Sequence, residues 1–75
     1  MSDNFTNDLF TIDFDTSHYV MFETYRDWCF KKFGYGDWGH RVHGNNIWSC
    51  DTFFGRTAFY FKHEKDLIWF TLVWL

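Results

Sequence analysis

The chain has 75 residues, enough for one domain, and its formal net charge of −3 argues against non-specific DNA binding as its main role. Aromatic residues dominate its composition: it has eleven Phe, five Trp and four Tyr, and each of these side chains can bury roughly 150–250 Å². These rings can build a core without metal or disulfides. Some of them should also remain exposed, which suggests a partner surface.

Charge and cysteine content indicate in which compartment the protein functions. Residues 1–24 carry five acids and no Lys or Arg, whereas residues 25–62 carry six bases and three acids. Two cysteines do not make a disulfide framework, and the start lacks the basic and apolar regions of a signal peptide. No run approaches the roughly 18 apolar residues of a membrane span. We therefore expect a cytoplasmic protein with free thiols and no membrane association.

The first half of the chain predicts a strand followed by a helix. Residues 1–8 have the composition of a loosely ordered polar terminus. Residues 10–15 alternate apolar and polar side chains, typical of a strand whose outward face is polar and acidic. Three candidate N-caps at 15–17 precede a helix that runs to about Phe33 and ends at Gly34. Its predicted apolar face comprises Met21, Phe22, Tyr25, Trp28, Cys29 and Phe33, with Phe30 on the polar side.

The middle of the chain predicts a loop and a hairpin. The glycines of residues 34–39 favour a loop, and residues 44–46 form a turn signal. Residues 47–53 and 57–62 read as two strands, joined by a turn at 55–56.

The tail from residue 64 onward fits two patterns. As a helix it would place Leu67, Phe70 and Trp74 on one stripe, with Ile68, Leu72 and Leu75 on an adjacent one. Acids at Glu64 and Asp66 favour a helix, because negative charge is stabilising in the first turn. The strand preference of the apolar residues favours a second hairpin instead, so propensity leaves the choice open.

A resemblance favours the helix. The helix residues Tyr25, Asp27, Trp28, Cys29, Phe33 and Gly34 precede an ending of the form F-x-F-x-x-E-x-D-hydrophobic-x-x-F-x-L-x-W, at Phe59 to Trp74. This pattern resembles small uncharacterised proteins of tailed bacteriophages, although Val73 stands where those proteins place a basic residue. The resemblance implies a strand followed by a short helix, and no activity or site. The implied order is β-α-β-β-α: an α+β fold with two helices on one face of a small antiparallel sheet, similar to a truncated ferredoxin-like domain.

Catalysis and metal binding find little support in the sequence. The spacing of Cys29, His40, His43 and Cys50 matches no common zinc pattern. Cys50, His43 and Asp51 supply the residue types of nucleophilic catalysis, but so would many chains. Glycines 34, 36 and 39 have dinucleotide-motif spacing but follow a helix rather than a strand. We expect no enzyme activity, no metal and no cofactor.

Protein binding is the preferred function. The predicted contact residues are aromatic or basic side chains that the helix and strand patterns leave outside the core: Phe30, Tyr35, Trp38, Arg41 and Phe54. Trp, Tyr and Arg dominate interface hot spots. If the phage resemblance holds, the partner would be a host protein, and a homodimer through the same rings is a variant.

Single-stranded nucleic acid is the alternative partner. Exposed aromatic rings beside basic residues are typical of surfaces that stack bases. The candidates for this role are Lys31, Lys32, Arg41, Trp48, Arg56 and Tyr60. The negative net charge weighs against this alternative.

Overall fold

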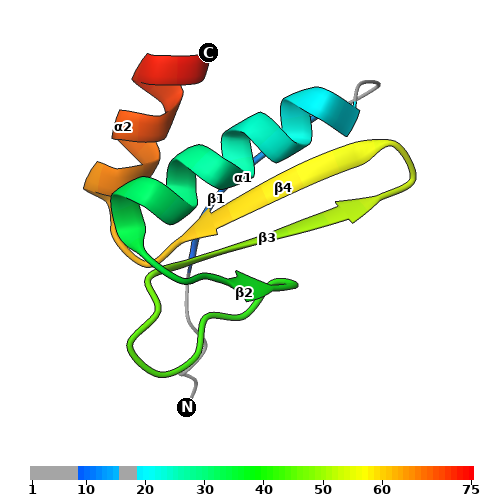
Figure 1. The fold of residues 1–75 in the computed structure, drawn as a ribbon. Coiled ribbons are helices and arrows are strands. Elements are labelled where there is room, and N and C mark those ends of the chain that lie inside the picture. The colour runs from blue at the N-terminus through cyan, green and yellow to red at the C-terminus, as the bar shows by residue number, and fades with distance from the viewer. Residues whose placement is uncertain (1–8, 16–18) are drawn as a thin grey trace.

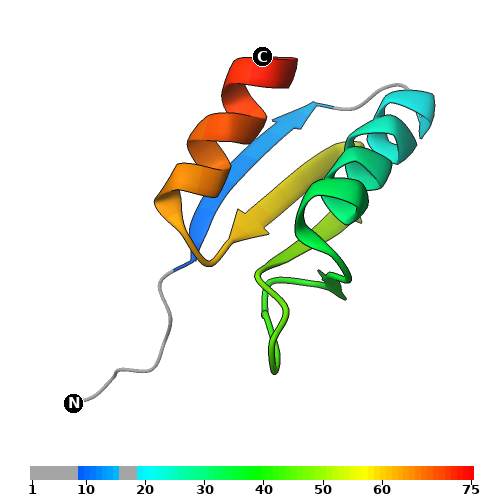
Figure 2. The same cartoon turned by 60° about the vertical axis from the view of Figure 1, so that its left-hand side comes forward.

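The computed structural model describes residues 9–15 and 19–75, leaving the side chains of residues 19–21 outside the description. Its elements are β1 (Phe10–Asp15), α1 (Tyr19–Phe33), β2 (Asp37–Trp38), β3 (Trp48–Phe53), β4 (Arg56–Phe61) and α2 (Glu64–Trp74). The strands form one sheet in the order β1-β4-β3-β2, and both helices cover the same face (Figures 1 and 2). The predicted α+β class is confirmed. The predicted terminus 1–8, the N-caps Thr16 and Ser17, and the side chain of Met21 lie outside the described residues.

The register of the sheet fixes which side chains face the helices. β4 runs antiparallel between β1 and β3, with Phe59 opposite both Ile12 and Cys50. Because side chains alternate along a strand, these three point to the helix-covered face. Asp13 lies opposite Ala58, on the open face of the sheet. The predicted polar and acidic face of β1 is therefore the uncovered one.

The short strand β2 differs from the prediction. Residues 34–39 were expected to form only a loop, but Asp37 and Trp38 pair in parallel with Ser49 and Cys50 of β3. The Gly39 amide continues this edge by donating to the Cys50 carbonyl at 2.8 Å. The sheet is thus mixed rather than antiparallel, and its strand order is not the standard ferredoxin-like one. Local composition missed β2 because backbone pairing at an edge needs no particular side chains.

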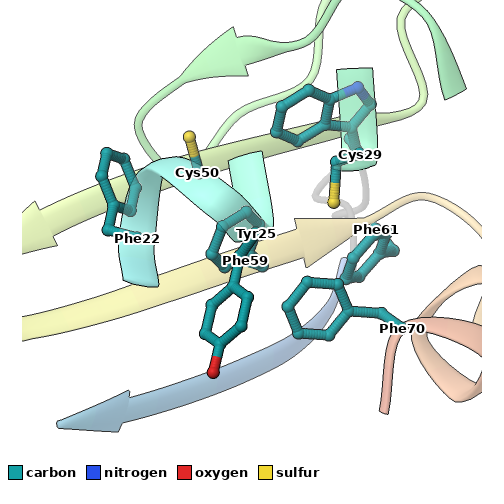
Figure 3. Close-up of a cluster of buried hydrophobic side chains, with 8 residues drawn as sticks. Phe22, Tyr25, Cys29, Cys50, Phe59, Phe61 and Phe70 are labelled. Atoms are coloured by element: carbon teal, nitrogen blue, oxygen red, sulfur yellow. The ribbon is translucent and has the colours of Figure 1, made fainter. Parts of the chain in front are cut away.

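Aromatic rings from α1, β3, β4 and α2 build the core (Figure 3). Phe59, Phe61 and Phe70 are fully buried, and the Phe70 centroid lies 5.0 Å from Phe59 and 5.6 Å from Phe61. Tyr25 brings α1 into the same cluster, 5.7 Å from Phe70. Fully burying one such ring stabilises the fold by about 1.5–3 kcal/mol, so this cluster holds both helices to the sheet.

The β3–β4 turn lies one residue earlier than predicted. Phe54 and Gly55 form the two-residue loop, with φ angles of 49° and 77°. Positive φ at both positions suits the twist of a tight hairpin, and Gly55 adopts it without steric cost. The Phe54 side chain projects from the tip of the turn, fully exposed.

The end of α1 and the start of α2 follow the signals in their sequences. Gly34, at φ 84°, donates its amide to the Phe30 carbonyl at 2.9 Å and ends α1. Glu64 and Asp66 occupy the first turn of α2, where the helix dipole favours acids. The helical reading of the tail is confirmed, because α2 docks Phe70 into the core as the predicted stripe requires.

Candidate functional site

The segment after α1 is locked by a buried indole. Trp48 Nε1 donates to the Gly34 carbonyl at 2.8 Å. The backbone at Gly36 lies so close to the same ring that an added Cβ would approach Trp48 Cζ2 to 2.6 Å. Only glycine permits this approach. Tyr35, between the two glycines, is therefore held pointing outward, with 76% of its surface exposed.

A second set of polar contacts fixes the far side of β2. The Asp37 carboxylate accepts the His43 amide at 2.6 Å, and its other oxygen lies 3.5 Å from His43 Nδ1. The hydrogen bond from the His43 amide is the main cause that lowers the pKa of Asp37. Ser49 donates its hydroxyl to the Gly39 carbonyl at 2.7 Å. Strand β2 and the loop that follows it are thus held in place by side-chain hydrogen bonds as well as by backbone pairing.

Exposed rings line one side of α1. The rings of Phe30 and Tyr35 lie 5.2 Å apart, and Trp38 meets Phe22 edge-on at 5.9 Å. Phe22, Arg26 and Phe30 follow one another at four-residue spacing, so they share one stripe of the helix. The Arg26 guanidinium sits over the Phe22 ring at 5.8 Å. We define the aromatic row as Arg26, Phe30, Tyr35 and Trp38.

The structure brings together three of the five predicted contact residues. Phe30, Tyr35 and Trp38 are all exposed and belong to the aromatic row. Arg41 is exposed in the loop after β2. Phe54 sits at the hairpin tip, at the opposite end of α1 from Tyr35 (Figure 1). Arg26 was not among the predicted contact residues, although its four-residue spacing from Phe22 and Phe30 was a signal that could have identified it.

The nucleic-acid candidates do not form one basic aromatic surface. Trp48 is buried and its indole N–H is engaged, so it is wrong as an exposed stacking platform. Tyr60 faces the open side of the sheet, where burial raises its pKa and the nearby Asp51 and Asp13 raise it further. Arg56 lies 3.3 Å from the Asp13 carboxylate. Lys31 and Lys32 are in the last turn of α1. The acids around Tyr60 would repel a phosphate backbone.

The Cys and His residues are divided between the two sides of the sheet. Cys29 and Cys50 are buried free thiols between α1 and β3, and burial raises both pKa values, that of Cys50 to about 12. His40 instead contacts Tyr60 on the open face, and His43 pairs with Asp37. Over residues 9–15 and 19–75, no three His, Cys, Asp or Glu side chains are grouped to hold a metal. The buried thiols are poor nucleophiles because the thiolate form is disfavoured.

A second apolar surface lies on α2. Its outward side chains are all exposed, and we define the outer face of α2 as Ile68, Trp69, Leu72, Val73 and Leu75. Lys32 reaches this face from α1, with its Nζ 5.9 Å from the Trp69 ring centroid. The sequence showed Ile68, Leu72 and Leu75 as a stripe but could not say that the stripe stays uncovered.

Comparisons with known proteins found no match to any family model, curated protein or solved structure. The resemblance to tailed-phage proteins therefore stays a prediction. Among the helices that the structure describes, none is long and apolar enough to cross a membrane.

Proposed function

We propose that the chain is a non-enzymatic protein-binding module that docks its partner through the aromatic row. The observation that carries this proposal is the fixing of Tyr35 by the buried Trp48, which holds Gly34 and Gly36 on either side of it. A contact residue whose backbone is already held in place loses less conformational entropy on binding than one in a mobile loop. The row is thus exposed and preorganised at once.

The chemistry of the row indicates what it would bind. Tyr35 and Trp38 offer flat apolar area with a hydrogen-bonding edge, which suits the centre of an interface. Arg26, on the same stripe, adds a planar donor that pairs well with carboxylates. The matching partner surface is an apolar pocket with an acidic residue beside it.

The identity of the partner rests on the sequence resemblance. Similarity to tailed-phage proteins supports an accessory protein that meets a bacterial host protein in the host cytoplasm. We also propose that the scaffold is a truncated ferredoxin-like domain. Two features support the ferredoxin-like relation: β4 lies antiparallel between β1 and β3, and α1 follows β1 in the chain and precedes β3. The short strand β2 has no counterpart in that fold.

Affinity capture from bacterial lysate with matched variants tests the contact surface. Tyr35→Ser and Trp38→Ser change exposed rings of the row, so each should reduce capture of the specific partner at least about tenfold, a loss of about 1.4 kcal/mol. Phe54→Asn is the control, because it removes a still more exposed ring at the far end of α1. Capture that survives both row variants unchanged would overturn the proposal.

A fluorescence titration with short single-stranded DNA and RNA distinguishes protein binding from the alternative, nucleic-acid binding. The five tryptophans are an intrinsic probe, and we expect no saturable change. Saturable quenching that weakens with added salt would instead favour nucleic acid as the partner.

A further inference from the structure

Strand β1 is an edge of the sheet with a free backbone. The order β1-β4-β3-β2 leaves one side of β1 without a neighbouring strand among the described residues. The opposite edge, β2, has only two residues, whereas all six residues of β1 pair one-to-one with β4, so no bulge interrupts the strand. The free side of β1 therefore presents a regular row of backbone N–H and C=O groups, which is a template for another strand.

Helix α2 covers the sheet on the side of this edge. It packs on β1 and β4, while α1 packs on β3 (Figure 2). Trp69 turns toward α1, with its ring 5.2 Å from that of Trp28. Leu67 and Thr71, each two positions from Trp69, lie on the opposite side of the helix and so face the β1 edge. The Thr71 hydroxyl already donates to the Leu67 carbonyl at 2.9 Å, so this side of α2 offers mainly apolar contact.

The other face of β1 is acidic. Asp13 and Asp15 are exposed on the open face of the sheet. Arg56 of β4 donates to the Asp13 carboxylate at 3.3 Å, but both side chains are about half exposed, so the carboxylate stays accessible. Within the described residues, acids outnumber bases on the open face and around the start of α2: Asp13, Asp15, Asp51, Glu64 and Asp66 against Arg56, Lys62 and Lys65. A segment added to β1 meets an apolar helix on one face and net negative charge on the other.

We propose that the free edge of β1 binds an extended segment of another protein in which apolar and basic residues alternate. The segment's backbone pairs with that of β1, its apolar side chains lie under α2, and its basic side chains lie beside Asp13 and Asp15. Because side chains alternate between the two faces of a strand, one simple pattern fits both sides. This site is separate from the aromatic row, whose Trp38 lies in β2 at the opposite edge of the sheet.

A second copy of this chain fits the same edge poorly. Pairing β1 with β1 of another copy would set Asp13 and Asp15 beside the same acids of the second strand, and like charges on neighbouring strands are destabilising. β1 itself carries no Lys or Arg that could neutralise them. The two acids therefore oppose self-association through this edge and favour a basic segment.

Calorimetric titration with matched synthetic peptides tests the strand pairing. The probe is a short peptide of alternating valine and lysine, which should bind saturably. Two further peptides carry methyl groups on the backbone nitrogens of every lysine or of every valine, so each has one edge blocked. The isomer blocked on the pairing side should bind at least about tenfold more weakly, and the other should bind like the parent peptide. Absence of binding by the parent peptide overturns the proposal, and so does equal binding by all three.

Charge reversal tests which residues select the segment. A double variant with Asp13→Lys and Asp15→Lys should lose the valine–lysine peptide and gain an alternating valine–glutamate peptide, a gain that also shows that the sheet is folded. Glu23→Lys with Asp27→Lys makes the same change in net charge on α1 and should keep the original preference. An unchanged preference in the β1 variant would overturn the assignment of these acids. Tyr35→Ser should bind the peptide like wild type, which separates this site from the aromatic row.

Discussion

The two helices cover the same face of the sheet but turn different surfaces outward. α1 buries Phe22 and Cys29 and exposes Asp27 and Lys31, as a helix at a protein surface should. α2 buries Phe70 and leaves an apolar outer face. Since both are anchored by the same aromatic cluster, the difference does not come from docking. It lies in the residues that each helix turns outward, which are mostly polar or charged on α1 and apolar from Ile68 onward on α2.

The largest expected effect tests whether α2 is docked at all. Phe70→Ala removes a fully buried ring that meets Phe59 and Phe61, so it should lower the free energy of unfolding by about 3–5 kcal/mol. Urea unfolding followed by tryptophan fluorescence measures this change. Leu72→Ala, on the exposed side of the same helix, is the matched control and should cost less than about 1 kcal/mol in the monomer. Equal losses would mean that the two sides of α2 are equivalent in solution.

A smaller effect tests whether the Trp48 ring holds the backbone on both sides of Tyr35. Gly36→Ala places a methyl group against the Trp48 ring and should cost about 1–3 kcal/mol through overpacking. The signature is a shift in tryptophan emission together with the lost stability. Gly44→Ala is the control: Gly44, unlike Gly36, has open space around it, so any loss of stability there reflects its positive φ alone and leaves the Trp48 environment unchanged. A Gly36→Ala protein with native emission and stability would show that the loop is not held by the indole.

The smallest expected effect concerns the contact that closes the loop after β2. The Asp37 pKa is lowered in the folded state, so its stabilisation is present above the unfolded value of about 3.9 and is lost as pH falls through the folded value. Wild type should exceed Asp37→Asn in stability at neutral pH, and this advantage should shrink below about pH 4. Solvent screening keeps the effect small. An advantage that is constant with pH would show that the carboxylate charge plays no part.

Local signals in the sequence determined most of the elements. The alternation of residues 10–15 and 57–62, the glycine after Phe33 and the stripe of Leu67, Phe70 and Trp74 predicted elements that the structure contains. The exposed rings were also foreseen, since Phe30, Tyr35 and Trp38 fit no core pattern and are exposed. These predictions succeed because periodicity and capping depend on residues a few positions apart.

Only the tertiary structure determined how those elements pair and pack against one another. The pairing of β2 with β3, the burial of Trp48 against Gly36 and the packing of Trp38 on Phe22 of α1 each join residues more than ten positions apart. The same holds for the outer face of α2, because the sequence predicted its stripe but not whether that stripe is covered. A side-chain pattern shows that a helix has apolar faces. Which of them is covered depends on where the sheet ends, and that is set by the packing of the whole chain.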